Sequence, residues 1–233
     1  LAFFEPYIIL KTLKTKLVSN QAEFDVWMSN RGGVNYETVY LMGGWYDLVG
    51  KEKTIDLRTL GTKYLIGIPG AVQDKPKIRI NKNLKVSFNS QDTDFVGLTG
   101  DANAKTKYGT IEKVDISIVA GEDGRWRAEQ QGSILGVAWC TCKSCVIEVK
   151  GIDGEINKHG VRTEGVNQCD IENCTICVQA GDGGNGESHD SLPGGKDGVT
   201  GADAIAILQC DYVYRCQIEV KAGNGGSGGN GRN

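Results

Sequence analysis

Eight cysteines are the residues of this 233-residue chain whose type and spacing most directly suggest chemistry. Cys142 with Cys145, and Cys174 with Cys177, have the CxxC spacing found in many tetrahedral zinc sites. Both pairs lie in segments with strand-like alternation, and residues three apart in a strand point to opposite faces, so neither pair can close on one ion. A third copy of this segment carries Glu219 at the position of Cys177. We therefore expect buried thiols that fill a narrow core, with a zinc site or disulfides between neighbouring copies as the alternatives.

Acidic residues recur at equivalent positions of the same segments. Glu122, Asp153 and Asp182 follow three copies at the same distance, and Asn224 follows the fourth. Stacked carboxylates of this kind could bind calcium at Asp153 and Asp182. Asp or Asn before Gly is also a common turn residue, because it tolerates left-handed backbone. We therefore expect no cofactor, with calcium at these two aspartates as the alternative.

The chain offers few residues for catalysis. His159 and His189 stand in polar loops, and no serine or cysteine beside them has the spacing of a nucleophilic site. The sequence contains no phosphate-binding loop, zinc-protease helix or dinucleotide fingerprint. A charged group that could cluster beside Trp126 and act on a polysaccharide comprises Asp101, Asp115, Asp123, Arg125 and Arg127. A solvated corner explains the same residues, and we expect no enzymatic activity.

The elements that must position these residues repeat along the chain. Four segments share one pattern and begin at Val114, Cys145, Cys174 and Cys216, with a weaker fifth copy from Leu84. Their starts are 29 to 31 residues apart, except for the last interval of 42 residues, which contains an insertion. Apolar residues alternate within each copy, which predicts a strand. Short strands at a fixed period are typical of a parallel β-solenoid, whose coils stack about 4.8 Å apart.

A second strand precedes the last three copies and gives two columns of equivalent cysteines. Because equivalent residues of a solenoid stack on one another, we predict two ladders in the core. The ladders are Cys140, Cys169 and Cys210, and Cys145, Cys174 and Cys216. Each copy ends in Ala or Gly followed by Asp, Asn or Gly, which predicts a corner with positive φ at that place. A Greek-key sandwich is the rival fold, but it does not require like residues at a fixed spacing.

The stretch from Tyr36 to Ala71 resembles the opening coil of right-handed parallel β-helices of the pectate-lyase type. A strand runs into Gly-Gly and an aromatic residue, a second strand follows, and a third ends in Leu-Ile-Gly-Ile-Pro-Gly at residues 65–70. The resemblance covers residues 36–226 and implies an all-β, right-handed parallel β-helix. This superfamily includes polysaccharide lyases and hydrolases, phage tail spikes and fibre tips, and bacterial surface adhesins. The resemblance therefore implies a fold and does not choose one activity.

We expect three regions. Residues 1–33, with a short helix around Gln21 to Met28, form an N-terminal cap or attachment segment that protects a strand edge. Residues 34–222 form the parallel β-helix, with a corner insertion at about residues 183–200 that makes a loop on one face. Residues 223–233 form a glycine-rich tail.

The tail reads Gly-x-Gly with a period of three from Gly223. This period suits an extended helix of the polyproline type, which has no internal hydrogen bonds and becomes rigid only when bundled. Tip adhesins of contractile-tailed phages look similar at this point, because their glycine-rich segments form bundles whose connecting loops contact the receptor. A flexible linker is the alternative.

Composition limits the partners. A hydrophobic content of 39%, a net charge of -3 and a pI of 5.5 exclude a wholly disordered chain and give no basic footprint for nucleic acid. The first ten residues are apolar, but Glu5 and Pro6 interrupt them and lysines follow them instead of preceding them. We therefore predict neither a secretory signal nor membrane insertion.

These observations predict a non-enzymatic structural and receptor-binding protein, a phage tail fibre or tail tip adhesin on the virion tail or at a cell surface. Its N-terminal segment would contact other tail or surface-assembly proteins, and its loops would contact a host glycan or protein receptor. The predicted contact residues are Glu187, Ser188, His189, Asp190, Lys196, Tyr212 and Tyr214. A polysaccharide lyase or glycoside hydrolase of the same fold, and a zinc-binding interaction module, are the alternatives. Fibres of this fold are often trimers, so the resemblance allows a homotrimer.

Overall fold

The chain consists of parallel β-strands, with one helix among the residues that the structure describes. A computed structural model describes residues 14–29, 34–48, 54–70, 74–82, 94–120, 133–153, 160–187 and 196–229. Their strands form three sheets, and every paired strand is parallel to its neighbour.

The three sheets have seven, six and five strands. The seven-stranded sheet contains, in spatial order, β1 (Thr15–Val18), β2 (Thr38–Met42), β5 (Tyr64–Ile68), β8 (Thr110–Glu112), β11 (Thr141–Lys143), β14 (Asp170–Glu172) and β17 (Tyr212–Tyr214). The six-stranded sheet contains β3 (Gly44–Asp47), β6 (Pro76–Lys82), β9 (Asp115–Ala120), β12 (Val146–Lys150), β15 (Thr175–Gln179) and β18 (Gln217–Lys221). The five-stranded sheet contains β4 (Ile55–Asp56), β7 (Asp94–Thr99), β10 (Ser133–Ala138), β13 (Arg162–Asn167) and β16 (Ala204–Leu208).

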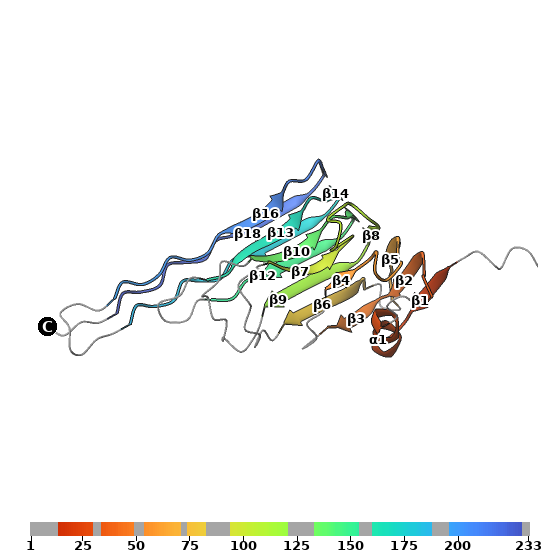
Figure 1. Cartoon of the computed structure of the whole chain (residues 1–233), viewed down its shortest axis with the longest axis horizontal. Coiled ribbons are helices and arrows are strands. Elements are labelled where there is room, and N and C mark those ends of the chain that lie inside the picture. Colours follow the sequence, from red (N-terminus) through yellow and green to blue (C-terminus); the bar gives the residue numbers. More distant parts are fainter. Residues whose placement is uncertain are drawn as a thin grey trace, which may run out of the picture.

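The chain enters the three sheets in rotation. From β2 onward it passes from the seven-stranded sheet to the six-stranded and then to the five-stranded sheet, and β17 and β18 begin a further pass; β1, before the first pass, also belongs to the seven-stranded sheet. We call one such pass a coil. Strands of successive coils lie side by side from the N-terminal to the C-terminal part of the chain (Figure 1). This arrangement is compatible with a parallel β-helix.

The strand register confirms the four strong copies of the repeat. Ile116 pairs with Ile147, Ile147 with Ile176, and Ile176 with Ile218. The predicted fifth copy from Leu84 was misplaced. Residues 84–90 lie outside the described part of the chain, and β6 supplies the strand that pairs with β9. Ile78 of β6 pairs with Ile116 of β9, an interval of 116 − 78 = 38 residues that exceeds the repeat period, so spacing alone pointed to the wrong segment.

The corners with positive φ lie at other places than predicted. They are single non-glycine residues between consecutive strands, namely Lys113, Ser144, Asn173 and Arg215 before the six-stranded sheet and Trp139, Gln168 and Gln209 before the seven-stranded sheet. The described residues after β12, β15 and β18 have no positive φ. One left-handed residue turns the chain sharply between adjacent strands, whereas after these three strands the backbone continues extended.

The helix α1 (Gln21–Ser29) covers the N-terminal end of the stack, as Figure 1 shows. Asn20 Oδ1 accepts a hydrogen bond from the amide of Glu23 at 3.0 Å, which caps the first turn. Phe24 and Trp27 are buried, and the Phe24 ring packs on Tyr46 with centroids 5.1 Å apart. The predicted helix around Gln21 to Met28 is therefore confirmed. Among the described residues, no helix has the length and apolar content needed to span a bilayer.

At the opposite end of the stack, apolar side chains of the last described coil are exposed. Ile218 is 47% exposed and Val220 is 47% exposed, whereas their counterparts one coil earlier, Ile176 and Val178, are 0% and 3% exposed. The core therefore lies between the sheets from the first coil to β14 and β15, and the last coil covers it.

Candidate binding site

Three extended, glycine-rich segments leave the last coils together. They are residues 181–187 after β15, residues 196–202 before β16 and residues 222–229 after β18. We call them the glycine bundle. Figure 1 shows them as a thin projection that continues the direction of these strands. The bundle thus extends along the direction of these strands, and it includes both described ends of the predicted corner insertion at about residues 183–200 as well as the predicted tail from Gly223.

Backbone hydrogen bonds join the three segments in a closed cycle. Gly183 donates to the carbonyl of Asn224 at 2.7 Å, Gly226 donates to Val199 at 2.8 Å, and Val199 donates to Gly184 at 3.0 Å. The same exchange recurs every third residue, from Gly186 to Ser227, from Gly223 to Ala202, from Gly229 to Lys196, from Ala202 to Gly181 and from Lys196 to Glu187. Residues 222–229 are therefore bundled, and the linker alternative does not describe them.

Glycine is required where the segments approach one another. A Cβ atom on Gly226 would lie 2.0 Å from the carbonyl oxygen of Gly184, and one on Gly183 would lie 1.9 Å from that of Val199. Real Cβ atoms do not approach backbone so closely. Gly225 faces away, because the nearest atom to its Cβ position is 3.9 Å distant. The period of three in the sequence thus corresponds to one inward residue per turn.

Side-chain oxygens connect the base of the bundle to the coil below. Asp153 Oδ1 accepts the amide of Asp182 at 2.8 Å, and Asp182 Oδ1 accepts the amide of Asn224 at 2.7 Å. The Asn224 amide lowers the pKa of Asp182 from its usual value. The predicted stack of these three residues is confirmed, and these oxygens act as backbone acceptors. No group of three cation ligands forms here among the described residues, and the calcium alternative at Asp153 and Asp182 stays untested.

An ion pair closes the far end of two bundle segments. Lys196 Nζ lies 3.0 Å from Glu187 Oε2, and the Lys196 amide donates to the Glu187 carbonyl at 3.1 Å. The structure thus brings together two predicted contact residues, and residues 188–195 connect them in the chain. Ser188, His189 and Asp190 lie outside the described residues.

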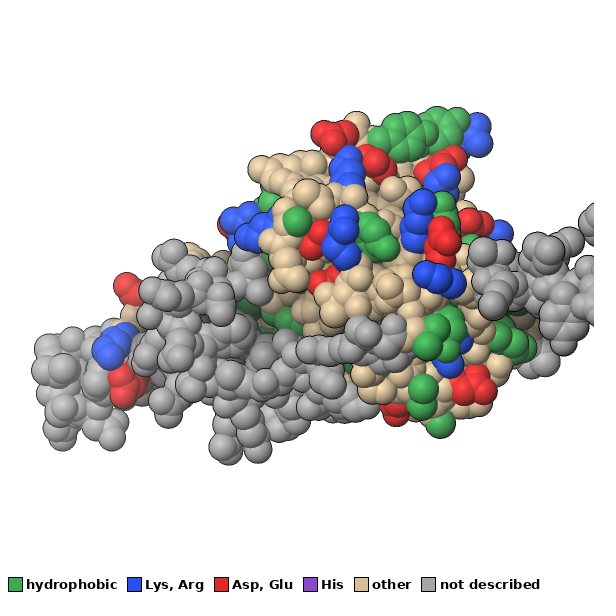
Figure 2. Space-filling model, turned by 45° about the vertical axis from the view of Figure 1, so that its right-hand side comes forward, with side chains coloured by type: hydrophobic (Ala, Val, Ile, Leu, Met, Phe, Trp, Pro, Cys, Tyr) green, Lys and Arg blue, Asp and Glu red, His purple; other side chains and the backbone are tan. Residues whose placement is uncertain are grey.

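The other two predicted contact residues form an exposed aromatic pair on the last strand of the seven-stranded sheet. Tyr212 is 49% and Tyr214 is 42% exposed, and their rings are stacked with centroids 6.2 Å apart. Arg215 lies over the Tyr214 ring, 4.9 Å from its centroid. Figure 2 shows hydrophobic side chains beside a basic one at the top of the view, and elsewhere on this face acidic and basic side chains are interspersed.

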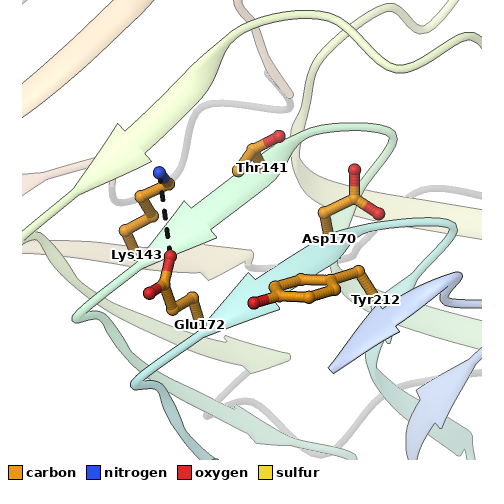
Figure 3. Close-up of a pocket in the computed structure, with 5 residues that line it drawn as sticks. All are labelled: Thr141, Lys143, Asp170, Glu172 and Tyr212. Carbon is orange, nitrogen blue, oxygen red and sulfur yellow. Dashed lines mark ion pairs between the residues drawn. The ribbon is translucent and has the colours of Figure 1, made fainter. Parts of the chain in front are cut away.

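A shallow pocket of about 330 Å³ lies beside this pair on the outer face of β11, β14 and β17. Figure 3 shows its lining residues, Thr141, Lys143, Asp170, Glu172 and Tyr212. The Lys143 ammonium lies 3.7 Å from Glu172, and the flat Tyr212 ring borders Asp170. An aromatic face can stack on a sugar ring, and carboxylates beside it can accept hydrogen bonds from the sugar hydroxyls.

Sequence reasoning missed the residues that surround Tyr212. Lys107 Nζ lies 2.7 Å from Asp170 and 2.8 Å from Asp211, and hydrogen bonds to these carboxylates raise the pKa of Lys107. Strand alternation could have placed Asp170 beside Tyr212, since both are outward residues of adjacent copies. Nothing in the spacing indicated Lys107, which comes from a connection before β8.

All eight cysteines are free, and those of the predicted ladders stack as expected. Cys140, Cys142, Cys145, Cys169 and Cys174 are buried, and Cys177, Cys210 and Cys216 are partly exposed. A hydrogen bond with Cys174, and burial, raise the pKa of the Cys145 thiol. Burial also raises the pKa of Cys210 to about 11.

One premise about the CxxC pairs was wrong. Cys142 and Cys145 both face the core, because the left-handed corner at Ser144 separates β11 from β12. Cys174 and Cys177 do point to opposite faces: Cys174 is buried, and Cys177 borders a pocket on the outer face of the six-stranded sheet.

The residues considered for catalysis are not assembled in the described part of the chain. Asp101 Oδ2 lies 2.6 Å from Arg58 Nε, and the amide of Ala104, which donates to Asp101, lowers the pKa of that carboxyl. Asp115 has a buried Oδ1 without a hydrogen-bond partner. Residues 123–127 and both histidines lie outside the described residues.

Comparison with known proteins gives no relative: no family model, no curated protein and no solved structure matches the chain.

Proposed function

We propose that the protein is a non-enzymatic receptor-binding protein that presents the far end of the glycine bundle to a host surface, as a fibre or tail tip adhesin of a phage does. In this proposal the sheets form a right-handed parallel β-helix, a stiff support that resists bending. The bundle carries residues 187–196 away from that support. A glycan or protein of the host surface is the receptor.

The observation that carries the proposal is the closed end of the bundle. The Glu187–Lys196 ion pair and the backbone bond beside it hold the two ends of residues 188–195 together. Fixing both ends of a connecting segment on a rigid support reduces the entropy lost when it binds a partner. This use also explains why the connection from β15 to β16 contains two extended, glycine-rich segments.

The N-terminal part of the chain supports an attachment role. α1 and β1 complete one end of the stack, and residues 1–13 lie before them and outside the described residues. In the proposal this end joins other tail or surface-assembly proteins. The bundle and the attachment point then belong to different parts of the molecule, so binding a receptor leaves the assembly contacts free.

The test is binding of the labelled, purified protein to a panel of intact bacterial cells and to their extracted surface polysaccharides. The tip variant replaces residues 188–195 by Gly and Ser at the same length and keeps Glu187 and Lys196. We expect wild type to bind at least one member of the panel and the tip variant to lose that binding. Unchanged binding by the tip variant would contradict the proposal.

The matched control is Trp45→Ala, which removes a 57% exposed aromatic side chain of β3 and leaves the bundle and the Tyr212–Tyr214 pair intact. We expect it to bind as wild type does. The same polysaccharides, incubated with protein and calcium, are then examined for shortened or unsaturated products. Such products would support the lyase or hydrolase alternative instead.

A further inference from the structure

Three buried sulfur atoms converge inside the stack. The Sγ atoms of Cys140, Cys142 and Cys169 all lie within 4.8 Å of one another, and those of Cys140 and Cys142 are 3.7 Å apart. All three residues are 0% exposed. This group differs from both CxxC pairs that the sequence suggested, because it combines a spacing of two with a stacked residue from the next coil.

The fold explains how the three thiols meet. Cys140 and Cys169 are equivalent residues of successive coils, each directly after a left-handed corner at Trp139 or Gln168. Cys142 points into the core from β11. The cluster therefore combines two stacks of equivalent residues: Cys140 and Cys169 belong to one, and Cys142 belongs to the other.

The residues that stack on Cys142 in the adjacent coils distinguish this sulfur cluster from ordinary packing. Cys142 pairs with Ile111 on one side and Ile171 on the other, so an aliphatic side chain fits the column in adjacent coils. The Cys142 side chain is smaller than isoleucine, and its sulfur lies 3.7 Å from the sulfur of Cys140. Packing alone explains each cysteine singly but does not require three sulfurs to converge.

We propose that Cys140, Cys142 and Cys169 bind one Cu(I) ion in a trigonal, all-sulfur site. Sulfurs 3.7 to 4.8 Å apart lie roughly 2.1–2.8 Å from an ion at their centre, a range that includes the ~2.3 Å of a metal–thiolate bond. Small rotamer changes would equalise the three distances.

The donor set selects the ion. Structural zinc requires four ligands, and no fourth histidine, cysteine or carboxylate joins this group among the described residues. Complete burial leaves no open position that water could fill. Soft thiolate ligands select Cu(I), which accepts three-coordinate sulfur geometry.

Binding is an exchange of one proton for the ion, without electron transfer. One thiolate offsets the charge of Cu(I) and releases its proton to solvent, and the other two sulfurs bind as neutral thiols, so the buried site stays neutral. Copper enters already reduced, so no oxidant or reductant is needed. Because the site has no exposed surface, the ion must enter before the last coils close over it.

The experiment refolds the full chain from denaturant under anaerobic, reducing conditions with Cu(I), or in parallel with Zn²⁺. Each sample is then dialysed against a chelator of the metal it received, which strips that metal from partly exposed thiols such as Cys177, and retained metal is measured by atomic emission. We expect one copper per chain, a sulfur-to-copper charge-transfer band in the near ultraviolet and a higher melting temperature than the copper-free protein. Zinc retained in preference to copper, or no retained copper, would overturn the proposal.

Matched variants locate the site. Cys142→Val replaces a ligand by a side chain like those of the neighbouring column members, so the core stays filled. Its retained copper should fall by about tenfold or more, since loss of even an outer-shell partner costs that much. Cys145→Val makes the same change at a buried cysteine outside the cluster, where the equivalent residue one coil earlier is Val114. This variant should retain copper within about twofold of wild type. Equal losses in the two variants would show that the three named cysteines are not the ligands, and circular dichroism verifies that both variants fold.

Discussion

Single side-chain oxygens join successive coils where the bundle begins. Asp153 and Asp182 each accept the amide of the equivalent residue one coil later, and Asn185 does the same for Ser227 at 2.8 Å. Amides that would otherwise lack a partner at this edge are thereby satisfied. The spacing predicted that Asp153 and Asp182 stack, but the sequence could not show that the acceptor is the side chain and the donor the next backbone.

Acid should weaken this contact. The pKa of Asp182 is lowered by the Asn224 amide, so the charged form is favoured in the folded state. Its stabilising effect is therefore present above the usual Asp pKa of about 3.9 and is lost as pH falls through the lower folded value. Asp182→Asn keeps Oδ1 as an acceptor but cannot titrate.

Urea unfolding between pH 5 and pH 2.5 measures this effect. The free energy of unfolding should decrease more for wild type than for Asp182→Asn as the pH is lowered. Asp182→Ala, which removes the acceptor, should be less stable than wild type at pH 7 as well. Parallel pH profiles for wild type and Asp182→Asn would contradict this role of the carboxylate.

Among the elements, the glycine bundle differs most from what sequence patterns predict. Alternation of apolar residues predicted the strands that contain Ile116, Ile147, Ile176 and Ile218, because period two is visible along a single strand. The bundle could be only partly predicted. Residues 222–229 show period three, but their partners are irregular in sequence, and their pairing depends on backbone bonds between segments far apart in the chain.

Two glycine substitutions test whether glycine is required only at the inward positions of the bundle. Gly226→Ala places a Cβ 2.0 Å from the Gly184 carbonyl, so the segments must move apart. We expect it to destabilise the bundle by about 2 kcal/mol, as overpacking does. Gly225→Ala meets nothing nearer than 3.9 Å and should change stability by less than about 0.5 kcal/mol, as surface substitutions usually do. Urea denaturation of both variants, followed by resonances of the bundle, measures the difference, and equal effects would show that the inward position is not special.

At the scale of the whole molecule, the sequence predicted an all-β chain of repeating strands, and the structure has three sheets of parallel strands. The direction of the bundle could not be predicted, because it follows from which strands the three segments continue. The sequence predicted Tyr212 as a contact residue but not the pocket beside it, because Lys107, which pairs with Asp170 there, comes from a connection with no repeat pattern. One end of the stack is covered by α1, and the bundle leaves near the other.

Amide hydrogen exchange, followed by NMR on the isotopically labelled protein, tests most directly whether the bundle is a rigid element able to present its end. We predict slow exchange for the bonded amides of Gly183, Gly186, Val199, Gly223 and Gly226. Gly225 and Gly228, whose amides make no backbone bond among the described residues, should exchange fast and serve as internal controls. Uniformly fast exchange along residues 181–187 and 222–229 would contradict the bundle and the receptor-binding proposal that depends on it.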